Sequence, residues 1–175
     1  EYTWLRSLMK RHKNFWDITE DSLDKSMKVF NINKNMKNEL LSLYKILSPY
    51  PEVREVLEDL KKKNFKLAIL SNGTPDLLNE LVESNKLNNL FDDLFSIEEV
   101  KIYKPDPRVY ELPIKKYKIK SNEITFLSAN TWDVSGGGNF GYNSIWVNRH
   151  NSVFDILDFH PKNEISNLTQ LLDIV

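Results

Sequence analysis

The chain has 175 residues, of which 41% are hydrophobic, and carries 24 Lys and Arg against 25 Asp and Glu. This length can bury the core of one α/β domain, and 11% aromatic residues with a net charge of −1 exclude a disordered chain. The balanced charge argues against a nucleic-acid-binding protein, and the absence of cysteine excludes a disulfide scaffold and a thiolate zinc site. No apolar run is long enough to span a membrane, and we expect a cytoplasmic protein.

The first fifty residues predict helices and no strands. Apolar residues recur at helical spacing over 4–9 and again over 40–47. Between these stretches, a polar cluster at Thr19 predicts the start of a further helix, and 31–35 is a turn-rich break. We therefore expect a helical region at 1–50 and a differently built core at 51–175.

After residue 50, short apolar runs alternate with amphipathic stretches. This alternation over short links predicts a parallel sheet with helices on both faces, which is a three-layer, Rossmann-like α/β core. Ligands bind such sheets outside the carboxyl ends of the strands, so the links that follow strands hold the candidate site residues. The predicted strands are 65–70, 91–97, 124–127 and 144–147, and the predicted helices are 53–60, 75–82, 107–117 and 165–175.

Two of these links carry groups suited to anions and carboxylates. Ser71 and Asn72 lie just before a helix N-terminus, where free N–H groups attract a carboxylate, a phosphate or a leaving anion, although both are also ordinary turn residues. Lys104 precedes a segment stiffened by two prolines, so its ammonium can neutralise a carboxylate nucleophile. The alternative for Lys104 is a solvated lysine before a helix.

The link after the third predicted strand holds more polar groups. Asn130 and Asp133 can point into one crevice, although Asp133 could equally be a helix N-cap. Trp132 suits either an apolar substrate pocket or the core, and the glycines at 136–138 predict a close approach of the backbone to a neighbour. No Ser or Cys elbow accompanies the histidines, and we expect all three on the surface: His12, His150 and His160.

Together, three motifs resemble the haloacid dehalogenase superfamily, and in detail its (S)-2-haloacid dehalogenases. They are Ser71-Asn72-Gly73, Lys104-Pro-Asp-Pro-Arg-Val-Tyr110 and Ser128-Ala-Asn-Thr-Trp-Asp133, in the order and roughly the spacing of that family. The segment 2–9 also resembles the family's first cap helix. The resemblance covers nearly the whole chain and implies a Rossmann-like core with a helical cap subdomain at 1–50.

The resemblance implies a hydrolase that converts (S)-2-haloacids to (R)-2-hydroxyacids through an aspartyl ester. It implies no cofactor and no metal, a small-molecule 2-haloacid as partner, neither nucleic acid nor membrane, and a possible homodimer. In the implied roles, Lys104 holds the nucleophile, Ser71 binds the substrate carboxylate and Asn72 receives the halide. The lysine and the water are ordered by Ser128, Asn130 and Asp133. The pocket is lined by Phe15, Tyr110 and Trp132.

The sequence departs from the family pattern at its start. The family's nucleophile motif, an Asp shortly before Gly-Thr, and its halide-binding arginine precede the cap, whereas this sequence opens inside the cap with Glu1. We therefore expect the nucleophile and the first core strand upstream of residue 1. Two alternatives stay open, a Mg²⁺-dependent phosphatase of the superfamily and a non-catalytic truncated paralogue. Asn130 favours the dehalogenase, because an amide is a weaker Mg²⁺ ligand than the carboxylate that a phosphatase has there.

Overall fold

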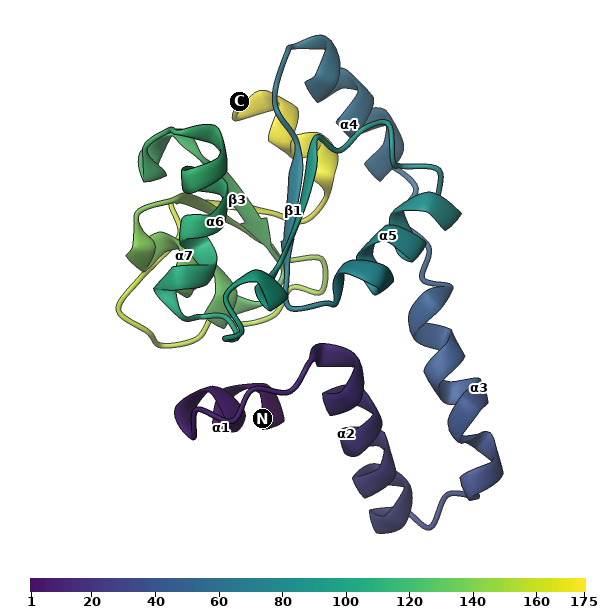
Figure 1. The fold of residues 1–175 in the computed structure, drawn as a ribbon. Coiled ribbons are helices and arrows are strands. Elements are labelled where there is room, and N and C mark those ends of the chain that lie inside the picture. The colour runs from purple at the N-terminus through teal and green to yellow at the C-terminus, as the bar shows by residue number, and fades with distance from the viewer. The chain divides into compact units, whose positions relative to one another are not determined.

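The computed structural model describes residues 1–175, which form two compact units. The first unit comprises 1–49 and 68–103, and the second comprises 50–67 and 104–175 (Figure 1). The first unit thus joins the predicted helical region to two strands of the predicted core. The division into a cap at 1–50 and a core at 51–175 stays a prediction.

The first fifty residues are helical, as predicted. The long helix of this region starts at Phe15, four residues before the predicted start at Thr19. The reason is Asn14, whose side-chain oxygen accepts a hydrogen bond from the N–H of Asp17 at 2.8 Å and so caps the helix. The elements are α1 (Tyr2–Leu8), α2 (Phe15–Val29), η1 (Lys34–Met36), α3 (Lys37–Ser42) and η2 (Leu43–Lys45), where η denotes a 3-10 helix.

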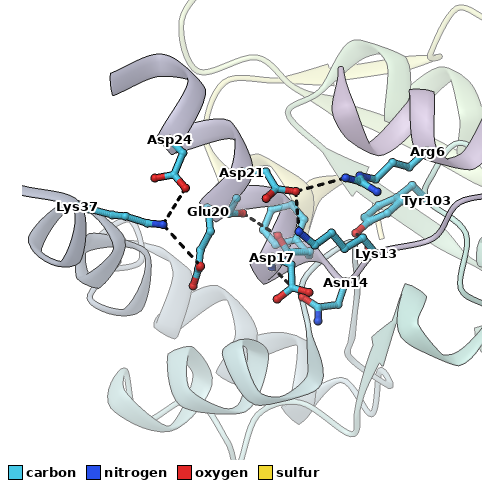
Figure 2. Close-up of polar contacts among 11 residues, drawn as sticks. Arg6, Lys13, Asn14, Asp17, Glu20, Asp21, Asp24, Lys37 and Tyr103 are labelled. Atoms are coloured by element: carbon cyan, nitrogen blue, oxygen red, sulfur yellow. Dashed lines mark hydrogen bonds and ion pairs between the residues drawn. The ribbon is translucent and has the colours of Figure 1, made fainter. Parts of the chain in front are cut away.

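Ion pairs join α2 to the segments before and after it (Figure 2). Asp21 accepts hydrogen bonds from Lys13 at 2.7 Å and from Arg6 of α1 at 3.3 Å. The hydrogen bond from Lys13 lowers the pKa of the Asp21 carboxyl. On the next turn of α2, Asp24 accepts from Lys37 of α3 at 3.0 Å. Solvent screens these accessible pairs, so they orient the helices more than they stabilise them.

The first unit also holds a two-stranded parallel sheet, in which β1 pairs with β2 and Ser71 lies beside Ser96. The strand β1 starts three residues later than predicted and ends at Ser71. Thr74 caps the following helix and Pro75 occupies its first turn, as the sequence predicts. The elements are β1 (Ala68–Ser71), α5 (Pro75–Ser84), β2 (Asp93–Ser96) and η3 (Ile97–Glu99).

The second unit is built on the parallel sheet β3-β4-β5. The parallel α/β architecture predicted from the sequence is confirmed. The helix over 107–117 continues through Pro113. The elements are α4 (Val53–Lys62), α6 (Pro107–Tyr117), η4 (Ser121–Glu123), β3 (Thr125–Ser128), α7 (Thr131–Phe140), β4 (Asn143–Val147), β5 (Asn163–Ile165) and η5 (Leu168–Asp173).

The strands of this sheet bury side chains on both faces. Because successive side chains point to opposite faces, Phe126 and Ser144 lie on the face that Gly137 of α7 approaches. The other face packs against α4 and η5 (Figure 1). That second layer forms a buried apolar cluster of Val56, Leu60, Ile145, Val147, Ile165 and Leu171.

The predicted helix over 165–175 is wrong in its first part. Ile165 is the last residue of β5, pairs with Val147 and is 2% exposed. Strand pairing and burial in the apolar cluster therefore hold this residue extended. A helix begins only at Leu168, as a 3-10 helix that the Asn167 side chain caps. None of the helices has the length and apolar character needed to cross a membrane.

Candidate active site

Lys104 and Asp133 form a buried ion pair in the second unit. Lys104 Nζ lies 3.0 Å from Asp133 Oδ2, and the two residues are 4% and 5% exposed. Charged groups are buried almost only when they are paired, because desolvating a lone charge is costly. The alternative interpretation of Lys104 as a solvated surface lysine is therefore wrong.

Aromatic side chains complete the surroundings of this pair. The Tyr110 hydroxyl donates to Asp133 Oδ1 at 2.8 Å, so each oxygen of the carboxylate has its own donor. Lys104 Nζ lies 4.9 Å from the centre of the Phe126 ring and 5.7 Å from that of the Tyr110 ring, within cation–π distance. The ammonium is thus held in one place by three neighbours, which suits a group that must meet a second anion in a fixed geometry.

Burial shifts the protonation equilibria of this cluster. Desolvation lowers the pKa of the Lys104 ammonium, and the nearby Asp133 carboxylate opposes that shift. Desolvation also raises the pKa of the Tyr110 hydroxyl, and Asp133 adds to the increase. Tyr110 therefore remains a protonated donor to Asp133 across the physiological pH range.

Local sequence signals place the two charged residues. Asp106 accepts from the backbone N–H of Arg108 at 3.0 Å and caps α6, so the helix starts directly after the Lys104 segment. The Arg108 guanidinium also donates to Asp106 and lowers the pKa of that carboxyl. Asn130 occupies the N-cap position of α7, which puts Asp133 in the first turn, where the helix dipole favours a carboxylate. The alternative of Asp133 as the N-cap is wrong.

The other candidates in this unit follow β3. Ser128 is the last residue of the strand, and its hydroxyl oxygen accepts from the Asn130 N–H at 3.2 Å. Asn130 is exposed and Trp132 is half-buried. Asn130 and Trp132, together with Trp146 and Arg149, line a hollow of about 320 Å³ beside the carboxyl ends of β3 and β4. The hollow lies where ligands bind parallel sheets.

Tyr110, expected from the resemblance to line the pocket, lies beside the ion pair, and its role toward the substrate stays a prediction. Its side chain is fully buried, is not among the residues around the hollow, and hydrogen-bonds to Asp133. The sequence motif cannot reveal this, because Tyr110 and Asp133 belong to different helices. The structure places Tyr110 with the ion pair.

The remaining three candidates belong to the first unit. Ser71 ends β1, and its hydroxyl oxygen accepts from the Gly73 N–H at 3.0 Å. The buried Ser96 hydroxyl donates to the Gly73 carbonyl at 2.6 Å, so this turn is fixed from both sides. Asn72 lies within the turn, and Phe15 is the half-buried first residue of α2. The roles expected for these residues remain predictions.

His12, predicted to lie on the surface, instead belongs to a partly buried cluster that the sequence does not indicate. His12 Nε2 lies 3.0 Å from Glu98 Oε2, and each side chain is 20% exposed. The His12 ring lies 5.6 Å from that of Tyr103, whose buried hydroxyl donates to the carbonyl of Lys13. His12 and Glu98 are 86 positions apart, and no local pattern signals such a pair. The surface prediction is confirmed for His150 and His160.

Comparison with known proteins identifies relatives along nearly the whole chain. Residues 8–147 match the family described as haloacid dehalogenase-like hydrolase. The chain is 37% identical over 174 residues to (S)-2-haloacid dehalogenase 4A of Burkholderia cepacia, which covers 98% of this chain and 75% of that protein. A solved structure of a dehalogenase matches with a TM-score of 0.96 and 34% identity, over 99% of this chain and 78% of the other. The L-2-haloacid dehalogenase from Xanthobacter autotrophicus matches with a TM-score of 0.92 and 27% identity, over 99% and 80%.

Proposed function

This chain belongs to the haloacid dehalogenase-like hydrolases, and we propose that it hydrolyses (S)-2-haloacids to (R)-2-hydroxyacids. The observation that carries the proposal is the buried Lys104–Asp133 pair together with Asn130 in the same strand-to-helix link. The pair provides a fixed ammonium, and the link offers an amide where a metal-dependent relative would need a carboxylate. The similarity to (S)-2-haloacid dehalogenases supports the choice of substrate.

The proposed reaction has two steps. A carboxylate oxygen of an aspartate N-terminal to residue 1 attacks C2 of the haloacid, and the carbon–halogen bond breaks with both electrons leaving on the halide. Water then adds to the carbonyl carbon of the aspartyl ester. The bond between that carbonyl carbon and the C2 oxygen breaks, one proton of the water passes to the C2 oxygen to give the 2-hydroxyacid, the other proton is released, and the aspartate carboxylate is regenerated. Attack from the face opposite the halide inverts the configuration at C2.

The proposal gives each candidate residue a task. Lys104 neutralises the nucleophilic carboxylate, and Asp133 holds Lys104 in place, which the 3.0 Å contact supports. Ser128 and Asn130 order the hydrolytic water. Ser71 binds the substrate carboxylate, Asn72 receives the halide, and Phe15 and Trp132 provide apolar walls for the substrate.

A phosphatase of the same superfamily is the main competing function. Mg²⁺ prefers carboxylate oxygens, and Asn130 offers only an amide in the link that leads to Asp133. A leaving halide can be stabilised by amide and cationic donors alone. The residues of the second unit therefore support dehalogenation better than phosphoryl transfer.

The test uses the full-length protein with (S)-2-chloropropionate. We expect stoichiometric chloride and (R)-lactate, unchanged turnover in EDTA, and no competing hydrolysis of p-nitrophenyl phosphate. Loss of turnover in EDTA, or faster hydrolysis of the phosphate ester, would establish the phosphatase. No turnover of either substrate by a folded, full-length protein would establish a non-catalytic paralogue.

A further inference from the structure

Three consecutive glycines, at positions 136–138, lie within α7, one turn after Asp133. Glycine is a poor helix former, and none of these three has a positive φ, so the backbone conformation does not require it. What requires it is space. A Cβ at Gly137 would lie 2.7 Å from the Phe126 ring, and one at Gly138 would overlap the Phe159 ring.

Gly136 differs from the other two because its neighbours belong to the ion-pair cluster. A Cβ at this position would lie 2.5 Å from the Tyr110 hydroxyl oxygen and 2.8 Å from Cβ of Pro105, the residue after Lys104. Gly136 follows Asp133 by three positions, so both lie on the same face of α7. The backbone of α7 is therefore part of the wall against which the Tyr110 hydroxyl rests.

Tyr110 has no room to retreat from a larger residue. Its side chain is fully buried, and its ring lies 5.9 Å from the rings of Phe126 and Tyr142 and 5.8 Å from that of Phe140. Tyr142 also donates its hydroxyl proton to the backbone carbonyl of Tyr110, which fixes this turn of α6. A methyl group at 136 must therefore displace the Tyr110 hydroxyl, the Pro105 segment or α7 itself.

We propose that Gly136 is a positioning residue: the absence of a side chain there lets the Tyr110 hydroxyl reach Asp133 and so keeps Lys104 in its reactive position. The proposal rests on the proposed dehalogenase function. The contact between Gly136 and Tyr110 joins the helices α7 and α6, which pack against each other in the second unit (Figure 1). Without the hydroxyl, Asp133 Oδ1 loses its donor, the carboxylate can rotate, and Lys104 Nζ loses its fixed partner.

The test compares Gly136→Ala with Gly138→Ala in the full-length protein. Both variants make the same change in the same helix, but a Cβ at Gly138 would meet the ring of Phe159, a partly exposed residue of an irregular segment, whereas one at Gly136 would meet Tyr110 and Pro105 of the ion-pair cluster. With (S)-2-chloropropionate, we expect Gly136→Ala to lower kcat about 10²-fold, because a misplacement of about 1 Å has that effect. KM should stay within about twofold, and Gly138→Ala should keep both constants near those of the wild type.

A double-mutant cycle with Tyr110→Phe separates positioning from general damage to the fold. In the Tyr110→Phe background the hydroxyl is absent, so Gly136→Ala should lower kcat much less than it does in the wild type. If Gly136→Ala alone does not fold, a double variant that folds and keeps the kcat of Tyr110→Phe supports the proposal, because Phe removes the closest contact, and a double variant with a much lower kcat than Tyr110→Phe overturns it. An equal loss of kcat in both backgrounds, or wild-type kcat in a folded Gly136→Ala variant, would overturn the proposal.

A crystal structure of the Gly136→Ala variant tests the same idea without activity. We expect the 2.8 Å hydrogen bond between Tyr110 and Asp133 to be broken. Its retention would refute the role of Gly136 even in an active enzyme. A wild-type protein that releases no chloride would instead refute the proposed function, and the structure of the variant would still decide the question of Gly136.

Discussion

At the scale of single residues, the Lys104 ammonium is placed between the Asp133 carboxylate and two aromatic rings with almost no exposure to solvent. In water such an ammonium would have to reorganise its hydration shell whenever a reacting carboxylate approached. In this cluster its position is set by its neighbours, and a charge that is positioned in advance is the kind that is most effective in catalysis. The cost is that each partner depends on the other to remain buried.

Replacing Lys104 by Met tests both sides of this dependence. We expect kcat for (S)-2-chloropropionate to fall about 10²- to 10³-fold, the usual loss for one preorganised electrostatic group. The free energy of unfolding should fall by about 3–5 kcal/mol, because Asp133 would stay buried without its cationic partner. Chloride assays and urea unfolding measure the two effects.

The matched control is Lys115→Met on α6. Lys115 is exposed and pairs with Glu111 one turn away at 2.6 Å. Such a pair contributes about 0.3–0.5 kcal/mol, so the stability and kcat of this control should stay close to those of the wild type. Near-normal turnover in Lys104→Met would mean that the buried lysine serves only the fold.

Some residues of the candidate site can be predicted from the sequence, whereas contacts made by tertiary packing cannot. The motifs around Lys104 and Asp133 are contiguous, so the sequence predicts their residue types and their places in the links that follow β2 and β3. The hydrogen bond from Tyr110 to Asp133 is not predictable, because Tyr110 lies on another helix and its hydroxyl reaches the carboxylate only through tertiary packing. The pairing of His12 with Glu98 escaped prediction for the same reason.

At the scale of elements, capping residues determine which helix starts can be predicted from the sequence. Thr74-Pro75 and Asp106-Pro107 combine a side-chain acceptor with a proline in the first turn, and both helices start there. Asn14 gives no such double signal, so the start of α2 was predicted too late. Ile165 was misassigned because tertiary pairing with β4 outweighed the local helical pattern.

The cap of α2 gives the prediction at this scale. Asn14→Ala removes the acceptor for the Asp17 N–H and should lower the free energy of unfolding by about 1 kcal/mol, with the first turn of α2 fraying. Asn14→Ser keeps a side-chain acceptor and should retain most of the stability. Urea unfolding measures both variants, and hydrogen exchange at the first turn locates the effect. Equal stability of Asn14→Ala and the wild type would mean that the ion pairs of Asp21 hold this end of α2 without the cap.

At the scale of the whole molecule, both units bury tyrosine hydroxyl groups in hydrogen bonds. Tyr103 lies in the first unit, and Tyr110 and Tyr142 lie in the second, each at most 4% exposed. Burial raises the pKa of all three hydroxyls above the ordinary value. Unfolding therefore restores three ordinary phenols to water, which couples the stability of each unit to alkaline pH.

The direction of this coupling follows from proton binding. Above a pH of about 10 the unfolded chain loses the three protons, whereas the folded protein retains them, so stability must fall as the pH rises. Each tyrosine contributes a slope of about 1.4 kcal/mol per pH unit. Lys104 acts in the opposite direction at lower pH. Its lowered pKa makes the unfolded state the better proton binder, so its contribution increases stability up to the ordinary lysine pKa of about 10.4.

We therefore expect the free energy of unfolding, measured in urea between pH 8 and pH 11.5, to fall steeply only above about pH 10. Tyr142→Phe removes one of the phenols and should reduce that slope by about 1.4 kcal/mol per pH unit, although losing its bond to the Tyr110 carbonyl lowers stability at every pH. Val56→Ala in the apolar cluster is the matched comparison, because it weakens the same unit without removing a titrating group. It should shift the whole stability curve downwards and leave its alkaline slope unchanged. Equal slopes for the wild type and Tyr142→Phe would show that the Tyr142 hydroxyl ionises as readily in the folded protein as in the unfolded chain.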